Sequence, residues 1–309
     1  MAGTTIEIND IISPDNLAVE IAKRWQEWSN LRHKKVEEWK ELRNYLYATD
    51  TRTTSNAMLP WSNTTTIPKL TQLMDNLHAN YFATLFPQQR WMKFEPADRF
   101  SNKREKIDTI QGFIENKVRQ SDFVNTASDL LYDWIQYGNC FATVEYENNV
   151  LEKEDGTVSV VYEGPRVVRV SPFDIVFNPT AASFYKAPKV IRSIKTLGEI
   201  KRMIDEDPSK TYLAEVLDKM VSARAAVRGV DSTIDKADGY IADGFTSIQQ
   251  YYESDYVEIL TFYGDIYDYA NGDFWSNRII TVVDRAYVLA NEENPSWLGH
   301  APIFHAGWR

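Results

Sequence analysis

The stretch that decides the fold is Gly138-Asn139-Cys140-Phe141-Ala142-Thr143-Val144-Glu145-Tyr146, where the spacing of the apolar residues changes. Before Gly138, apolar residues recur every three or four positions, which is typical of amphipathic helices. From Cys140 to Tyr146 they alternate with polar residues, which is typical of a half-buried strand. The sequence therefore predicts an N-terminal helical half packed against a β-rich half, which places the fold in the α+β class.

Four helices are expected before Gly138. The pair Ser13-Pro14 is a helix start, and the stripe after it predicts one long amphipathic helix whose residues 23–43 carry a net charge of +3. Its basic face is interpreted as solvated surface, with a DNA contact as the alternative. Further stripes begin after Pro68, near Ser101 and near Asp122, and Gly138 is the expected C-cap of the last one.

The later part mixes strands, turns and two helices. Asp155-Gly156 and Asn271-Gly272 are turn dipeptides, and Thr196-Leu197-Gly198-Glu199 is a capping box that opens a helix. These patterns divide the chain into a helical part (1–138), a β-hairpin and strand region with short helices (139–228), a mobile loop (229–250) and a second β-rich part (251–309). The last residues, Pro302 to Arg309, read as a strand with no loose tail after it, so we expect the polypeptide to continue.

Composition narrows the classes of protein. The formal net charge of −10 argues against general affinity for nucleic acid, because phosphate binding needs a basic face. No apolar run is long enough to span a membrane, and the N-terminus lacks the pattern of a signal peptide. A single cysteine fits a reducing compartment such as the cytoplasm. Aromatic residues make up 13% of the chain, which favours either extensive interfaces or an aromatic-rich core.

No catalytic, cofactor-binding or metal-binding residues are expected. The sequence has no Gly-rich phosphate loop, no dinucleotide fingerprint and no Gly-x-Ser-x-Gly elbow. Cys140 is interpreted as a small buried hydrophobe rather than a nucleophile. The remaining weak candidates are histidines without metal-ligand spacing and acidic turns that favour solvated surface: His33, His78, His300, His305, Asp205, Glu206, Asp207, Asp265, Asp268 and Asp273.

The succession of segments resembles the portal (head–tail connector) proteins of tailed bacteriophages, nearest to those of short-tailed phages. Four stretches carry the resemblance in order. The first runs from Trp61-Ser62-Asn63 through the helix ending at Leu85-Phe86-Pro87 to Trp91-Met92-Lys93-Phe94. The second is Asp129 to Cys140, the third is Val168 to Pro179, and the fourth runs from Val257 to Ala301-Pro302-Ile303-Phe304.

The resemblance implies a structural, non-enzymatic subunit of a ring, typically of twelve copies, at one capsid vertex of the virion. It implies the portal wing as the fold, with stem, clip and crown beyond Arg309. The implied partners are further copies of the chain, the major capsid protein, the terminase during packaging, a tail adaptor, and double-stranded DNA that passes without sequence-specific binding. Assembly would take place in the host cytoplasm, with no membrane and no cofactor.

Two other readings stay open. The first is another virion protein, such as a head-completion or tail adaptor subunit, which ring stoichiometry would separate from a portal. The second is a carbohydrate-active enzyme that uses exposed Trp and Tyr as sugar platforms, which the lack of catalytic motifs in the sequence disfavours. Glycan binding and hydrolysis assays would detect it.

Overall fold

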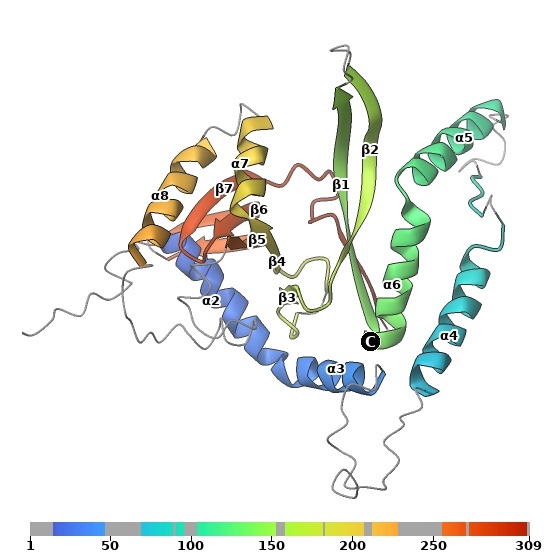
Figure 1. Cartoon of the computed structure of the whole chain (residues 1–309), viewed down its shortest axis with the longest axis horizontal. Coiled ribbons are helices and arrows are strands. Elements are labelled where there is room, and N and C mark those ends of the chain that lie inside the picture. Colours follow the sequence, from blue (N-terminus) through green and yellow to red (C-terminus); the bar gives the residue numbers. More distant parts are fainter. Residues whose placement is uncertain are drawn as a thin grey trace, which may run out of the picture. The chain divides into compact units, whose positions relative to one another are not determined.

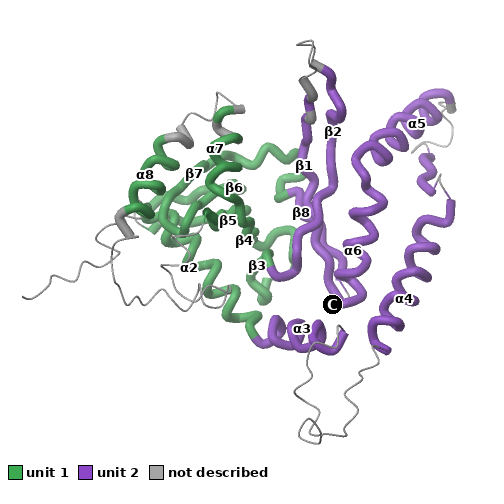
Figure 2. Tube along the Cα trace, in the orientation of Figure 1, with its two compact units in different colours: residues 1–33, 174–301 green, residues 34–173, 302–309 purple. Residues whose placement is uncertain are grey.

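The computed structural model describes residues 15–46, 69–88, 91–95, 104–152, 158–181, 183–206, 212–227, 255–269 and 272–307. The chain forms two compact units, each made of segments far apart in sequence (Figure 2). Unit 1 comprises residues 1–33 and 174–301, and unit 2 comprises residues 34–173 and 302–309. The boundary expected after residue 138 falls inside unit 2, because the helix before it and the strand after it belong to the same unit.

Unit 1 is built on a five-stranded antiparallel sheet of order β3-β4-β5-β6-β7. The order follows the chain, so each strand pairs with the next one (Figure 1). The strands are β3 (Ile175–Phe177), β4 (Lys189–Thr196), β5 (Tyr256–Asp268), β6 (Asp273–Val283) and β7 (Tyr287–Glu293).

Helices cover both faces of this sheet. Helix α2 (Asn16–Leu31) buries Ile21, Trp25 and Trp28 against Leu260 and Phe262 of β5. Helices α7 (Leu197–Glu206) and α8 (Tyr212–Val227) pack on the other face, where Ile200 and Met220 meet Val257 and Ile259. Alternate residues of a strand point to opposite faces, so β5 supplies two separate cores. Unit 1 is therefore a helix–sheet–helix sandwich.

The capping box predicted at the start of α7 is confirmed. The Thr196 hydroxyl oxygen accepts a hydrogen bond from the Glu199 N–H at 3.2 Å, and the Glu199 carboxylate accepts one from the Thr196 N–H at 2.9 Å. Two backbone N–H groups that have no partner within the helix are thereby satisfied.

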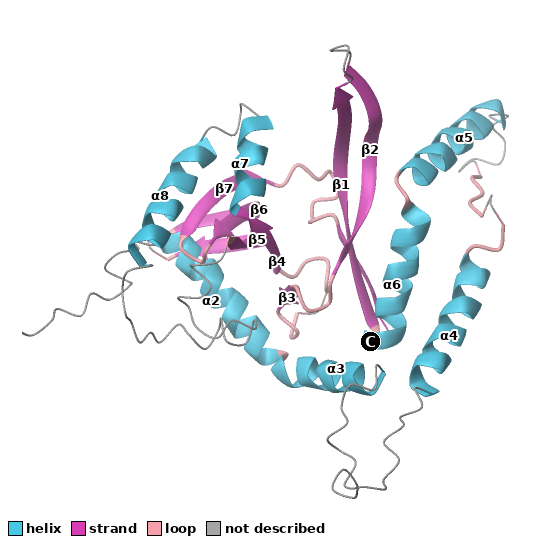
Figure 3. Cartoon of the chain, in the orientation of Figure 1, coloured by secondary structure: helices cyan, strands magenta, loops and turns pink. Residues whose placement is uncertain are grey.

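In its described residues, unit 2 joins four helices to a three-stranded antiparallel sheet of order β2-β1-β8. The helices are α3 (His33–Leu46), α4 (Lys69–Leu85), α5 (Arg104–Gln120) and α6 (Phe123–Tyr137), and the strands are β1 (Asn139–Glu152), β2 (Val158–Val170) and β8 (Ile303–Gly307). Helix α6 packs on β1, β2, α4 and α5, so it is the centre of the unit (Figure 3). It ends at Gly138, whose φ of 73° is the left-handed C-cap expected from the sequence.

The expected single first helix is wrong, because the helix breaks at Arg32. The backbone of Arg32 leaves the helical region at φ −99° and ψ 1°, and α3 starts at the next residue. The Arg32 guanidinium is buried and donates a hydrogen bond of 2.5 Å to the carbonyl of Ile175 in β3. This burial lowers the pKa of Arg32 to about 10. The break allows the side chain to reach the end of β3.

The mixed helix-and-sheet class is otherwise as expected from the sequence. The change to strand at Asn139 is confirmed, and so is the strand near the C-terminus. Several expectations lie outside the described residues: the helix start at Ser13-Pro14, the irregular segment with Trp61-Ser62-Asn63, the turn Asp155-Gly156, and the loop 229–250.

Candidate functional site

A chain of aromatic rings links α6 to α4 and to the segment that follows α4. Tyr132 of α6 stacks on His78 of α4 with ring centroids 3.7 Å apart. The contacts continue through four further ring pairs at 5.8, 5.0, 4.9 and 5.9 Å: His78–Phe82, Phe82–Phe86, Phe86–Trp91 and Trp91–Phe123. Such pairs add roughly 0.5–1.5 kcal/mol each beyond the area that they bury. These ring contacts therefore hold the end of α4 and residues 91–95 against the start of α6.

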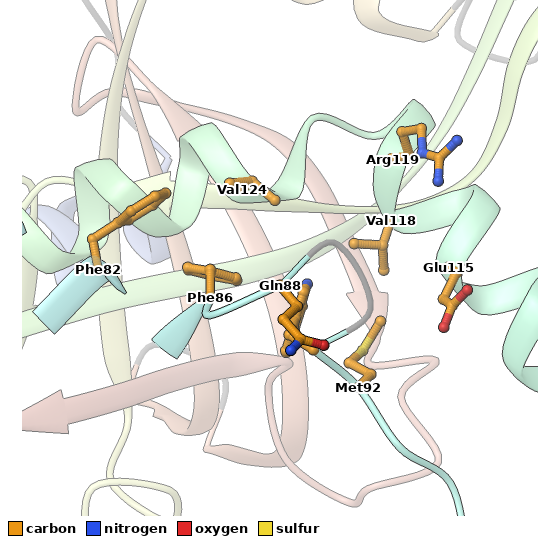
Figure 4. A pocket seen from close by; sticks show the side chains of 9 residues that line it. Phe82, Phe86, Gln88, Met92, Glu115, Val118, Arg119 and Val124 are labelled. Atoms are coloured by element: carbon orange, nitrogen blue, oxygen red, sulfur yellow. The ribbon is translucent and has the colours of Figure 1, made fainter. Parts of the chain in front are cut away.

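Three of these rings, Phe82, Phe86 and Trp91, line an apolar groove of about 560 Å³ (Figure 4). Three helices and one connecting segment contribute its apolar lining: Phe82 of α4, Val118 of α5, Val124 of α6, and Phe86, Trp91 and Met92 in the segment after α4. Glu115 and Arg119 of α5 lie at the end of the groove away from Phe82, as Figure 4 shows. We call this feature the aromatic groove.

Gln111 fixes one wall of the aromatic groove. Its side-chain amide donates hydrogen bonds to the carbonyl of Met92 at 3.2 Å and to the carboxylate of Glu115 at 2.8 Å. The segment 91–95 is thus tied to α5 rather than only resting on it. A groove held in this way is largely formed before anything binds, which lowers the entropic cost of binding.

Helix α4 carries a second apolar face that no described residue covers. Met74 is buried and His78 stacks on Tyr132 of α6, but Leu70, Leu73 and Leu77 are 46%, 56% and 37% exposed. The spacing of these three leucines keeps them on one side of the helix. Only Lys69 and Asp75 among its 17 residues bear a full charge. Apolar faces of this kind on a folded chain mark interaction surfaces.

The β1–β2 hairpin forms an arm that continues beyond the part packed on α6 (Figure 3). Strand β8 pairs with β1 only from Asn139 to Thr143. Further along the arm, Tyr146, Val150, Val160 and Val161 are between 45% and 71% exposed. A two-stranded ribbon with exposed apolar residues is marginally stable by itself, so it gains from a partner.

Cys140 lies in β1 and is half-buried. Burial raises the pKa of its thiol, whereas a nucleophilic cysteine needs a lowered pKa. Burial outweighs the backbone hydrogen bond at Ala306 that lowers the pKa, so the environment of Cys140 disfavours the thiolate.

The four histidines lie at separate places. His33 begins α3, and His300 and His305 belong to different compact units. His78 Nε2 lies 3.0 Å from the Ser128 hydroxyl, in a helix–helix contact closed by the stacked ring of Tyr132. His305 Nε2 lies 3.0 Å from the side-chain oxygen of Asn139, and burial lowers its pKa.

The acidic candidates with described side chains lie in ordinary surface positions. Asp265 accepts a hydrogen bond from the backbone N–H of Asn277 at 2.7 Å, and the backbones of residues 268 and 273 pair at the end of the β5–β6 hairpin. Asp205 is exposed at the end of α7, while Asp207 lies outside the described residues. Within the described ranges, no group of three or more His, Cys, Asp or Glu side chains is placed to hold a metal ion.

Sequence reasoning predicted the β1–β2 hairpin but missed its extension beyond the part packed on α6, and it missed the aromatic groove. The aromatic excess was the available signal, but it does not say which rings meet. Among the described residues, no helix combines the length and apolar character needed to cross a membrane. No protein-family model and no curated protein matches the chain.

Proposed function

We propose that the chain is a structural subunit of a bacteriophage portal ring, which forms the channel for DNA at the capsid vertex and the attachment point for the tail. The order of segments that resembles short-tailed-phage portals supports this proposal. So does the α+β architecture, in which helices and sheets pack into two units built from interleaved parts of the chain.

The observation that carries the proposal is the exposed leucine face of α4. Helix α4 is apolar on the side that packs on α6 and again at Leu70, Leu73 and Leu77. Each buried leucine is worth roughly 1.5–3 kcal/mol, so leaving this face in water wastes a large stabilisation that association would recover. Ile110 and Phe113 of α5, 51% and 63% exposed, add to the surface that a neighbour would cover.

The electrostatics suit a channel that DNA passes through. The net charge of −10 disfavours tight, salt-dependent binding to phosphates. Cations such as Arg169, Arg224 and Arg285 are held in ion pairs with carboxylates. DNA that must move in both directions needs a wall to which it does not adhere.

Sedimentation velocity over a range of protein concentrations tests the proposal. A closed ring gives one fast boundary whose position does not change with concentration, because a closed assembly has no free end. A boundary that shifts continuously indicates an open chain of subunits. A small symmetric oligomer favours the head-completion or adaptor reading, and a monomer at every concentration rules out both.

A further inference from the structure

We infer that a polar pocket of unit 2 binds an arginine or lysine side chain together with the carbonyl group next to its α-carbon. The polar pocket and the aromatic groove share no lining residue. The inference goes beyond the proposed ring, because binding in this pocket needs no second copy of the chain.

The polar pocket has a volume of about 490 Å³ and is lined by α3, α4, α6, β2 and the segment after β2. Helix α6 contributes more lining residues than any other element, and they are spaced so that they share one face of the helix. The residues on which the inference depends are Arg43 of α3, Asp75 of α4, and Asp129, Tyr132, Gln136 and Tyr137 of α6.

Contacts within unit 2 hold the helices around this pocket. The ring of Trp39 in α3 lies 5.6 Å from that of Tyr137 and 5.7 Å from that of Phe173, measured between centroids. The Thr71 hydroxyl of α4 donates a hydrogen bond to the carbonyl of Leu46, the last residue of α3. The pocket is therefore largely formed before a ligand arrives, which lowers the entropic cost of binding.

Negative charge is in excess in the lining. Among the described residues, Asp75 and Asp129 form no ion pair, whereas Asp133 is paired with Arg169. Burial raises the pKa of Asp133, and the nearby charge of Asp129 adds to that rise. With Arg43 counted as well, the lining carries a net charge of −1. A cation placed beside Asp129 relieves the repulsion between these carboxylates.

The lining also offers a hydrogen-bond donor that lacks an acceptor. The side-chain nitrogen of Gln136 is buried and has no hydrogen-bond partner within the described part of the chain. Leaving a buried donor unpaired is costly, so an oxygen supplied by a ligand would stabilise it. Gln136 lies seven residues after Asp129, which separates their Cα atoms by about 10 Å along α6. The ligand therefore needs an acceptor at some distance from its cation.

Aromatic rings line the space between these two groups. Tyr132 follows Asp129 by one turn of α6, and Tyr137 is next to Gln136. Tyr132 is held in place by its stacking on His78, with ring centroids 3.7 Å apart. The methylene stem of an arginine or lysine packs well on such rings, and its charged end is attracted to their faces.

One chemical class satisfies all of these features. The cation of an arginine or lysine side chain meets Asp129 and Asp75, and the carbonyl at the other end of the same residue accepts from Gln136. A simple amine leaves Gln136 without an acceptor, and an uncharged residue leaves Asp129 without a cation. The bound residue either belongs to a polypeptide or is the free amino acid, and the choice of probes separates these two sources.

Isothermal titration calorimetry of the intact protein tests the inference. The first probe is acetyl-arginine amide, which has the guanidinium and two carbonyl groups but neither of the charges of the free amino acid's backbone. The second probe is free L-arginine. Methylguanidine and acetyl-alanine amide supply the cation and the carbonyl groups separately, and each should bind about tenfold more weakly than the arginine compound, or worse. Tighter binding of acetyl-arginine amide assigns a polypeptide as the source, and tighter binding of L-arginine assigns the free amino acid.

Three variants locate the binding. Asp129→Asn keeps the shape of the side chain and should weaken binding by about tenfold or more, because the charged contact is lost. Gln136→Leu should also weaken binding, while its unfolding midpoint stays the same or rises, because an unpaired buried donor has been removed. Asp108→Asn is the matched control, since it removes an exposed carboxylate of α5 that does not line the pocket, and it should bind as the native protein does.

The inference is wrong if neither arginine compound binds, or if the separate halves bind as tightly as the whole. It is also wrong if Asp129→Asn and Gln136→Leu bind as well as Asp108→Asn does. None of these results affects the ring proposal, which depends on self-association alone.

Discussion

The Asp133 carboxylate of α6 accepts two hydrogen bonds from the Arg169 guanidinium of β2, at 2.5 Å from Nε and 2.7 Å from Nη2. The two partners differ in environment, because the Asp133 side chain is 4% exposed and that of Arg169 is 40% exposed. Burial raises the pKa of Asp133, and the guanidinium opposes that rise. This pair fastens the central helix of unit 2 to the base of the arm.

Because Asp133 is more buried than Arg169, we expect the two alanine variants to lose different amounts of unfolding free energy. Arg169→Ala leaves a buried carboxylate without its cation and should lower the free energy of unfolding by roughly 3 kcal/mol or more. Asp133→Ala leaves a guanidinium that can turn to water and should cost about 1 kcal/mol. Urea unfolding of both variants and of the double variant measures the difference. Equal costs, or a larger cost for Asp133→Ala, would contradict this reading of the pair.

Because Lys189 is buried, we expect the free energy of unfolding to rise at alkaline pH. Its side chain is 2% exposed, and its ammonium donates hydrogen bonds to the carbonyls of Ala187 at 2.8 Å and Tyr185 at 3.3 Å. Burial lowers its pKa from 10.5 to about 8. The unfolded chain therefore holds this proton at a pH where the folded chain has lost it. It follows that stability contributed by this site increases between about pH 8 and 10.5 and is constant below pH 8.

The Lys189 prediction is measured by urea unfolding of the native protein and Lys189→Met at several pH values. The difference in unfolding free energy between the two proteins should change by roughly 3 kcal/mol across this interval. Lys201→Met on the exposed face of α7 is the matched control for the loss of a lysine side chain. A profile of Lys189→Met that runs parallel to that of the native protein would mean that Lys189 keeps an ordinary pKa.

We expect replacement by alanine to have opposite effects on stability at two glycines. Gly264 of β5 has a φ of +134°, and a Cβ there would lie 2.9 Å from the Cα of Pro188. Gly112 of α5 has open space around the position of a Cβ. We expect Gly264→Ala to lower the unfolding free energy by about 1–3 kcal/mol. Gly112→Ala should raise it by about 0.5–1 kcal/mol, because alanine is the better helix former. Thermal unfolding of both variants compares them directly, and a stable Gly264→Ala would show that β5 can shift away from Pro188.

A charge placed on the leucine face of α4 should weaken self-association without changing the folding of the subunit. Leu73→Glu places a charge at a position that is 56% exposed in the single chain and covered in the proposed ring. Self-association should weaken by about tenfold or more, while the circular dichroism spectrum and unfolding midpoint of the subunit stay the same. Ala79→Glu adds the same charge at another exposed position of α4 and should assemble normally. Equal assembly by both variants would remove α4 from the interface.

Local features of this fold could be read from the sequence because they depend on neighbouring residues. The change of period at Asn139, the C-cap at Gly138 and the capping box at Thr196 are of this kind. The pairing of β8 with β1 joins residues more than 150 positions apart, and nothing in the alternation of Ile303 to Gly307 names its partner. The break at Arg32 likewise depends on a distant acceptor, the carbonyl of Ile175.

The candidate site was harder to foresee than the fold. The aromatic groove takes its lining from three helices and one connecting segment, so no single stretch carries its pattern. Helical spacing identified Leu70, Leu73 and Leu77 as one stripe, but it could not say whether that stripe packs inside the chain. Periodicity reports which residues share a face, and only the packed structure reports which faces remain open.

Electron microscopy of the intact protein, with its native mass measured on the same sample, tests the proposed portal ring most directly. A portal subunit should form closed rings with a central hole wide enough for duplex DNA and a mass close to twelve subunits. A uniform population of monomers or dimers from the intact protein would contradict it.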